Sequence, residues 1–351
     1  MALLSNSASY MGIDIGSTGI KIVELKKESG KIKLASYGFS ESEKSKTMDW
    51  QNNPELSARV IKKIIREAGI SAQSAISALP TFSVFSSILN LSNVSKKDIA
   101  SAIHWEAKKV IPLPLEDMIL DWKEIDASQK EKNNKQNVNN IKVLLTGAPR
   151  ILVKKYIEIF KLAKINLLSL ETETFSLIRS LLGNDKSTIM LVEVGASTTD
   201  VSVVDSIIPI LNRSIDVGGE KITEAIAKNL NISLDKSEQF KYDLGVSAIA
   251  SPGSKAPKAI IDAVSPVVNE IKYAINHFQD KNNKKIEKIV LSGGSALLPD
   301  LTKYLAKILD MKVIIGDPWS RVSYPEELKP LLQEIGPRLA VAIGLAIREL
   351  E

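Results

Sequence analysis

A glycine-rich turn near the start of the chain has the residue types that bind phosphate. Asp14 ends an alternating apolar run that predicts a strand, and Gly16 follows two positions later. Glycine tolerates a positive φ and lets backbone N–H groups face an anion closely. Further donors for phosphate oxygens stand beside it: Ser17, Thr18 and Lys21. Asp14 is placed to hold a metal ion through water, although an ordinary hairpin with a polar turn explains this segment equally well.

A second segment in the middle of the chain repeats this design. Glu193 ends an apolar run, Gly195 follows two positions later, and a second apolar run begins at Val201. Small and hydroxyl residues fill the turn: Ala196, Ser197, Thr198 and Thr199. Two such hairpins in the two halves of one chain predict a duplicated domain that holds phosphate between its halves.

A third glycine turn lies near the C-terminus. An apolar strand over 289–292 leads into Gly293, Gly294 and Ser295, and we expect a helix to start there. This arrangement lets the backbone pack against a flat ring, or against phosphate at a helix N-terminus. One strand-glycine-helix turn is weak evidence, whereas three glycine turns in this order favour a nucleotide site.

These segments resemble the actin-like ATPase superfamily, which includes actin, Hsp70 and sugar kinases. Within it they resemble the PilM family of type IV pilus assembly proteins, and the resemblance covers nearly the whole chain. It is carried by 12–17, 195–200, 218–223, 291–294 and 337–346. The resemblance implies an α/β actin-like ATPase fold with two duplicated RNase H-like domains and an inserted subdomain like that of FtsA.

The resemblance also implies domain limits. Residues 1–81 and 167–185 would form the first actin-like domain, and 82–166 the inserted subdomain. Residues 186–335 would form the second domain, and 336–351 a connecting helix that returns to the first.

The same resemblance implies the site residues for ATP and Mg²⁺. The phosphate-binding residues would be Gly16, Ser17, Thr18, Lys21, Gly195, Ala196, Ser197, Thr198 and Thr199. The adenosine-binding residues would be Gly218, Gly219, Glu238, Lys241, Gly293, Gly294 and Ser295. Asp14 and Glu193 would hold the metal, partly through water, and no catalytic residue is assigned. Glu193 departs from the aspartate usual in the superfamily, and we expect its longer side chain to shift the metal or slow hydrolysis. Glu238 and Lys241 also fit a solvated i,i+3 ion pair.

Two helices carry small residues at matching spacing, which predicts a close helix crossing. The sets stand at i, i+4 and i+8 and are Thr172, Ser176 and Ser180, and Gly336, Ala340 and Gly344. In actin-like folds such helices cross at the hinge between domains, although either spacing could arise by chance.

Composition is that of an ordinary globular protein of two domains. The 351 residues are 44% hydrophobic and 25% charged, with no cysteine and a net charge of +5. The absence of cysteine excludes disulfides. No apolar run reaches about 18 residues, and the start lacks the features of a signal peptide. We therefore expect a cytoplasmic protein that reaches the membrane only through a partner, and no nucleic acid, because no aromatic residues interleave the Lys/Asn tracts.

By resemblance, the partner is the cytoplasmic N-terminal peptide of the inner-membrane pilus protein PilN, together with other pilus assembly components. We expect it in a groove between the first subdomain and the insertion, with a strand over 83–89 as a free edge. One alternative is an FtsA-like cytoskeletal or cell-division ATPase, but the sequence ends without the amphipathic helix of FtsA. A second is a small-molecule kinase, but no spare carboxylate stands out as its base.

Overall fold

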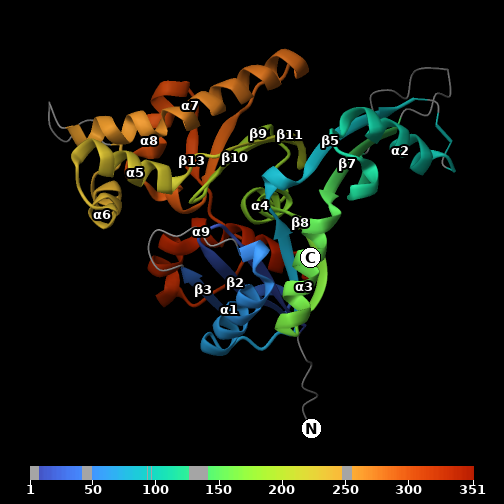
Figure 1. The fold of residues 1–351 in the computed structure, drawn as a ribbon, viewed down its shortest axis with the longest axis horizontal. Helices are drawn as coiled ribbons and strands as arrows, with labels where there is room; N and C mark the ends of the chain where they lie inside the picture. Colours follow the sequence, from blue (N-terminus) through green and yellow to red (C-terminus); the bar gives the residue numbers. More distant parts are fainter. Residues whose placement is uncertain (1–7, 42–49, 93, 96, 126–140, 247–254) are drawn as a thin grey trace, which may run out of the picture. The chain divides into compact units, whose positions relative to one another are not determined.

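The chain folds into two compact units of α/β structure (Figure 1). The computed structural model describes residues 8–41, 50–92, 94–95, 97–125, 141–246 and 255–351. The larger unit is Met1–Thr81 together with Ile157–Glu351, and the smaller unit is Phe82–Tyr156. The larger unit holds two five-stranded sheets, and the smaller holds one sheet of three strands.

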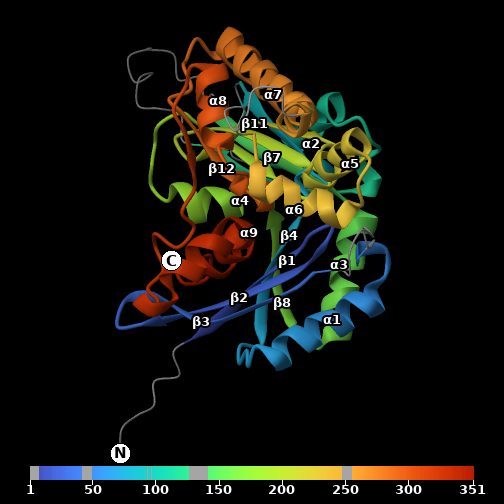
Figure 2. The same cartoon turned by 90° about the vertical axis from the view of Figure 1, so that its left-hand side faces the viewer.

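The first sheet of the larger unit has the strand order β3-β2-β1-β4-β8. The strands are β1 (Ser9–Ile15), β2 (Gly19–Glu28), β3 (Lys31–Glu41), β4 (Ser74–Leu79) and β8 (Asn166–Thr172). β1 pairs antiparallel with β2 and parallel with β4, which pairs parallel with β8. Helix α1 (Pro54–Glu67) lies on one face and α9 (Lys329–Ile347) on the other (Figure 2). Because both faces are covered, β1 is buried throughout 11–15.

The second sheet repeats the plan of the first, with the order β11-β10-β9-β12-β13. Its strands are β9 (Ile189–Val194), β10 (Thr199–Asp205), β11 (Ile208–Ile215), β12 (Lys288–Ser292) and β13 (Val313–Ile315). β9 pairs antiparallel with β10 and parallel with β12, just as β1 pairs with β2 and β4. Both sheets therefore place a hairpin turn and a parallel strand end at the same edge, as a duplicated domain predicts.

Helices pack on the second sheet around a large apolar core. They are α5 (Gly219–Leu230), α6 (Leu234–Leu244), α7 (Lys255–Asn282) and α8 (Leu301–Leu309). The short 3₁₀ helices of the chain include η1 (Trp50–Asn52), η2 (Thr81–Ser83), η3 (Leu115–Asp117), η6 (Gly294–Leu297) and η7 (Glu326–Leu328).

The predicted helix crossing is confirmed. The first partner is α4 (Glu173–Leu177), which continues into a π-helix, η5 (Ile178–Leu182). A Cβ placed on Gly344 of α9 would lie 2.0 Å from the Ser176 carbonyl oxygen, and Ser176 Oγ donates to the Val341 carbonyl at 2.5 Å. Only glycine lets the backbones approach this closely. Thr172 was predicted inside the helix, but it is the N-cap residue before Glu173.

The segment Glu326–Ile347 is long and apolar enough, by length and composition, to cross a membrane. Its most apolar window is 72% buried within the protein, between the first sheet and the crossing helix. Such burial is typical of a core helix.

The smaller unit has a sheet of order β5-β7-β6 with one helix packed on it. Its strands are β5 (Phe85–Leu91), β6 (Met118–Ile125) and β7 (Ile141–Pro149), and its helix is α2 (Ile99–Val110). Helix α3 (Arg150–Ala163) runs from this unit into the larger one. Asp98 is the N-cap residue of α2 and accepts a hydrogen bond from Ser95 Oγ at 2.6 Å. The predicted domain limits, including 82–166 for the insertion, stay a prediction.

Candidate functional site

The first glycine turn joins β1 to β2 and is closed by a hydrogen bond from Gly16 N to Gly19 O at 3.0 Å. Asp14 is 4% exposed and accepts a hydrogen bond from Lys21 Nζ at 2.8 Å. Burial lowers the pKa of Lys21, but the charge of Asp14 and this hydrogen bond outweigh it, so the pKa of Lys21 is raised. A cation therefore lies across the turn, where it would meet an incoming phosphate.

The second turn has the same closure, from Gly195 N to Thr198 O at 2.9 Å. The start of α5 is hydrogen-bonded to this turn, because Gly219 N donates to Gly195 O at 2.9 Å. A Cβ on Gly218 would lie 2.4 Å from the Ala196 carbonyl oxygen. Gly218 and Gly219 thus let the start of α5 pack closely on the turn, where Gly219 N and Glu220 N donate to the carbonyl oxygens of Gly195 and Ala196.

Of the two reasons predicted for the hairpin glycines, a positive φ and a close approach of N–H groups to an anion, the first is wrong. Neither Gly16 nor Gly195 has a positive φ. At Gly195, a Cβ would lie 3.1 Å from the Thr198 carbonyl oxygen, and at Gly16 it would lie 3.1 Å from Lys21 Nζ. A side chain at Gly195 would therefore crowd backbone, whereas one at Gly16 would crowd the end of a flexible lysine side chain.

Three carboxylates converge between the two turns. Glu173, Glu193 and Asp200 each offer an oxygen within 4.8 Å of the others. Glu173 accepts hydrogen bonds from Thr81 N at 2.8 Å and Thr81 Oγ1 at 3.1 Å, and Asp200 accepts one from Ser214 Oγ. Among the described residues, Glu193 Oε2 is buried without a hydrogen-bond partner.

The pKa values of these carboxyl groups are raised. Burial, together with the charges of Asp200 and Asp14, raises the pKa of Glu193 to about 8. Burial raises the pKa of Asp200 to about 6, against the hydrogen bonds from Ser214 and Thr198. Burial and the neighbouring carboxylates raise the pKa of Glu173 well above its usual value. Such a group of oxygen ligands, one of them unpartnered, fits a hard divalent cation such as Mg²⁺.

The third turn follows β12 and packs on the second one. Gly293 has φ +84°, and a Cβ there would lie 2.4 Å from the Val194 carbonyl oxygen. Ser295 Oγ donates to Gly195 O at 3.5 Å. An α-helix was expected to start at this turn, and that prediction is wrong. The turn leads into a 3₁₀ helix, Gly294–Leu297, and α8 begins only at Leu301.

The Glu238–Lys241 pair on α6 is not a solvated ion pair. Lys241 is 2% exposed and donates to Gly219 O at 3.1 Å, Thr223 Oγ1 at 3.0 Å and Glu238 Oε2 at 2.7 Å. Burial lowers the pKa of Lys241, and the attraction of Glu238 only partly offsets this effect. With three hydrogen bonds made inside the protein, Lys241 ties α6 to the start of α5, whereas Glu238 remains half-exposed.

A cavity of about 570 Å³ opens between the turns and α6. Predicted residues that line it are Thr18, Lys21, Glu193, Gly195, Ala196, Gly219, Glu238, Lys241, Gly293, Gly294 and Ser295. Predicted residues outside its lining are Asp14, Gly16, Ser17, Ser197, Thr198, Thr199 and Gly218, which lie in or behind the same turns.

Comparison with known proteins assigns the chain to a family. Residues 12–350 match the family model described as type IV pilus assembly protein PilM. The chain belongs to the PilM family. The cell division protein FtsA of Enterococcus faecalis is 20% identical over 350 residues, covering 88% of this chain and 79% of that protein. FtsA of Neisseria meningitidis is 26% identical over 178 residues, so the match spans only 41% of that protein and 45% of this chain.

Solved structures agree on the actin-like ATPase fold of this PilM family chain. A PilM–PilN type IV pilus biogenesis complex matches with a TM-score of 0.83 and 24% identity, covering 98% of this chain and 99% of that one. MreB5 of Spiroplasma citri bound to AMPPNP matches with a TM-score of 0.55 and 12% identity, over 98% and 96%. EutJ of Carboxydothermus hydrogenoformans has the same TM-score at 14% identity, over 96% and 89%.

Sequence reasoning missed several residues that lie at this candidate site. Glu173 and Asp200 complete the carboxylate group, and Arg338 lines the cavity beside Tyr242, with Nη2 3.4 Å from the tyrosine hydroxyl. A signal was present for Arg338, which is the one charged residue between Glu334 and Arg348 in an apolar helix. Glu173 stands at a strand-to-helix junction, but nothing in the sequence brings it to the turns.

Proposed function

We propose that the cavity binds ATP with Mg²⁺. The observation that carries this proposal is the unpartnered oxygen of Glu193 between two matching glycine turns. The turn backbones, their hydroxyl groups and Lys21 would hold the phosphates. Glu193, beside Glu173 and Asp200, would hold the metal, and Asp14, which is hydrogen-bonded to Lys21, would hold it through water. Glu238 and the Gly293–Gly294 turn, together with Tyr242 and Arg338, which also line the cavity, would enclose the adenosine. The bound metal would neutralise phosphate charge.

We also propose that hydrolysis is slow. Burial and the neighbouring carboxylates raise the pKa of Glu173 well above its usual value, which disfavours the charged form that a general base needs. Glu193, longer than the usual aspartate, would displace the metal. Glu193→Asp should keep ATP binding and raise turnover. Kinase-like turnover stimulated by a sugar or a carboxylic acid would overturn this proposal.

Nucleotide binding is tested by thermal unfolding with and without Mg-ATP. At about 100-fold excess over Kd, ATP should stabilise the parent protein by about 2.7 kcal/mol. Gly16→Val puts a branched side chain against Lys21 and should lose this stabilisation. Gly30→Asn is the control, because Gly30 lies in the distant β2–β3 turn with φ +76° and asparagine tolerates that region. If ATP stabilises both variants equally, the first turn does not contribute to the phosphate site.

We further propose that the chain is a cytoplasmic scaffold of the type IV pilus at the inner membrane, where it binds the cytoplasmic N-terminal peptide of PilN. Family membership and the PilM–PilN complex among the similar structures support this. We place the peptide within 82–166, where β5 pairs only with β7 among the described strands and leaves an edge free.

A synthetic PilN N-terminal peptide tests the partner. Hydrogen exchange should show protection between 70 and 166, and Mg-ATP should change peptide affinity by the same factor as peptide changes ATP affinity. Protection confined to 205–330 would place the groove elsewhere. No binding in either nucleotide state would end the proposal of PilN as partner.

A further inference from the structure

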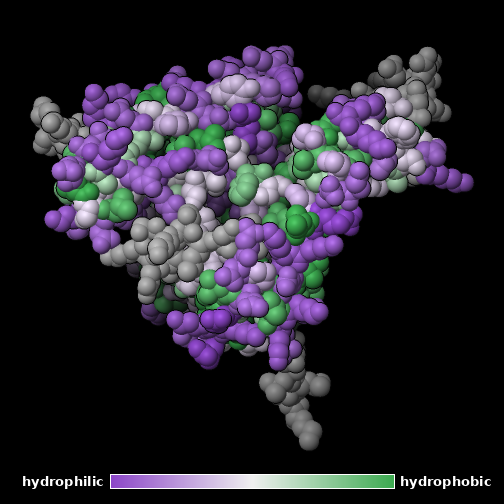
Figure 3. Space-filling model, in the orientation of Figure 1, coloured by the Kyte–Doolittle hydropathy of each residue, from purple (hydrophilic) through white to green (hydrophobic). Residues whose placement is uncertain are grey.

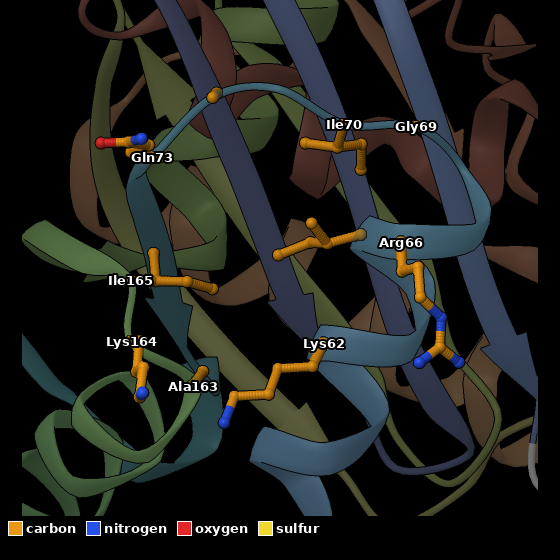
Figure 4. Close-up of a pocket in the computed structure, with 10 residues that line it drawn as sticks. Lys62, Arg66, Gly69, Ile70, Gln73, Ala163, Lys164 and Ile165 are labelled. Atoms are coloured by element: carbon orange, nitrogen blue, oxygen red, sulfur yellow. The ribbon is translucent and has the colours of Figure 1, made fainter.

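A second pocket lies in the larger unit, at the edge of the first sheet opposite the glycine turns. Its volume is about 390 Å³. Gln73 and Ile165, which line it, come directly before β4 and β8, whereas Asp14 lies near the other end of the parallel strands. The end of α1 and the end of α3 form its sides (Figure 4). The nucleotide proposal leaves this pocket unused.

The pocket has an apolar floor and a fixed wall. The floor is made by Ile65, Ile70, Ala163 and Ile165, of which Ile70 and Ala163 are buried. The wall is the 69–73 loop, held from below by the buried carboxylate of Glu24. This carboxylate accepts hydrogen bonds from Ser71 N, Ser71 Oγ and Ala72 N at 3.2, 2.8 and 2.8 Å. The concave shape therefore exists before any partner arrives.

Cationic side chains surround this floor. Lys62, Arg66 and Lys164 are exposed around the pocket in Figure 4. Among the described residues, their only ion pair is Arg66 with Glu67 at 4.0 Å. Exposed charged residues lie on α1, on the final turns of α3 and just after α3, and cations outnumber acids among them. They are Glu55, Arg59, Lys62, Lys63, Arg66, Glu67, Glu158, Lys161 and Lys164. The surface over α1 is accordingly mainly hydrophilic in Figure 3.

Helix ends explain only part of this charge. Both helices end at the pocket, and their carbonyl dipoles favour a cation in or beside the last turn. Arg66 and Lys164 satisfy that preference. Lys62 stands a full turn earlier, yet its side chain extends toward Ala163 across the pocket (Figure 4). The three cations and the apolar floor together match an anionic partner that also carries an apolar group.

We propose that this pocket is a docking site for an acidic peptide segment of a partner protein. A large apolar side chain of that segment packs on the apolar floor of the pocket. Acidic residues on either side of this side chain pair with Lys62, Arg66 and Lys164. A peptide fits better than an anionic bilayer, because a flat membrane surface contacts the exposed cations but leaves the concave floor empty. The site is distinct from the β5 edge proposed for PilN.

Fluorescence anisotropy with synthetic peptides tests this docking site. One set has a central leucine, isoleucine or phenylalanine flanked by aspartate or glutamate, and a matched set has lysine in place of the acids. The acidic set should bind the parent protein, and binding should weaken as salt screens the charges. The triple variant Lys62→Glu, Arg66→Glu, Lys164→Glu should raise Kd about tenfold or more, since three surface pairs are lost.

The control carries the same charge change on other helices, as Lys228→Glu, Lys272→Glu, Lys307→Glu. It should bind the acidic peptides like the parent, and both triple variants should keep the ATP-induced thermal shift. The proposal fails if no acidic peptide binds, if both triple variants lose binding equally, or if the PilN peptide displaces the acidic one. It also fails if the pocket variant binds phosphatidylglycerol vesicles less well than the parent but binds the acidic peptides as well as the parent, since the pocket would then be a membrane site.

Discussion

The carboxylates between the glycine turns should make the metal-free protein less stable as pH rises. Glu193 has a raised pKa of about 8 in the folded protein and an ordinary one near 4.5 when unfolded. Between these values the folded state holds a proton that the unfolded state has lost. Stability from this group is therefore full below about pH 4.5 and is lost as pH rises toward about 8, at about 1.4 kcal/mol for each pH unit.

From about pH 5 to about pH 7, Glu193 alone should lower the free energy of unfolding by about 2.5 kcal/mol. Asp200, whose pKa is raised to about 6, should act in the same direction at the lower end of this range. Because the two groups share one cluster, their effects should not add fully. Glu193→Gln keeps the size of the side chain and removes the titration, so it should stabilise the metal-free protein by about 2–3 kcal/mol near pH 7.

Urea unfolding with a chelator, measured at several pH values, gives these free energies directly. Glu327→Gln is the matched control, because Glu327 is exposed in η7 and away from the cluster. Adding Mg²⁺ should restore stability increasingly as pH rises, since the cation replaces the proton between the carboxylates. Glu193→Gln should weaken this restoration.

Equal pH dependence in the parent and Glu193→Gln proteins would refute the reasoning, because the buried charge would then not be the cause. Stability that rises from about pH 5 to about pH 7 without metal would refute it as well.

Three further predictions rest on single contacts. Gly344→Ala should destabilise the protein by about 1–3 kcal/mol in urea unfolding, since its Cβ would lie 2.0 Å from the Ser176 carbonyl oxygen; a change near zero would show that the hinge helices can separate freely. Glu24→Leu should cost about 1–3 kcal/mol and speed hydrogen exchange in the 69–73 loop, because it leaves N–H groups of that loop unpaired; unchanged exchange would contradict a fixed pocket wall. Lys241→Met should weaken ATP binding in calorimetry by releasing α6 from the start of α5; unchanged affinity would leave Lys241 a purely structural role.

The sequence alone was sufficient for the fold class and for the backbone turns of the site. A strand, a glycine turn and a second strand are local patterns, so the hairpins at Gly16 and Gly195 could be read directly from neighbouring residues. The repetition of that pattern predicted a duplicated domain, and the small residues around Ser176 and Gly344 predicted the helix crossing. Each of these patterns is visible within short stretches of the chain, so it can be recognised without knowing the packing.

Tertiary structure decided which side chains meet between those turns. Glu173 reaches Glu193 and Asp200 because β8 joins the edge of the first sheet and α4 begins beside Thr81, a juxtaposition of segments that no local pattern encodes. The burial that raises the pKa of Glu193 likewise comes from packing, since the same carboxyl group in an open hairpin would stay hydrated.

The role of Lys241 shows the same limit. Its i,i+3 spacing from Glu238 fits a solvated pair and a buried one equally well. Only the packing of α6 on the start of α5 gives the ammonium group Gly219 O and Thr223 Oγ1 as partners and removes it from water. Spacing along a helix determines which side chains share a face. The tertiary fold determines which element covers that face, and therefore the charge and hydrogen bonding there.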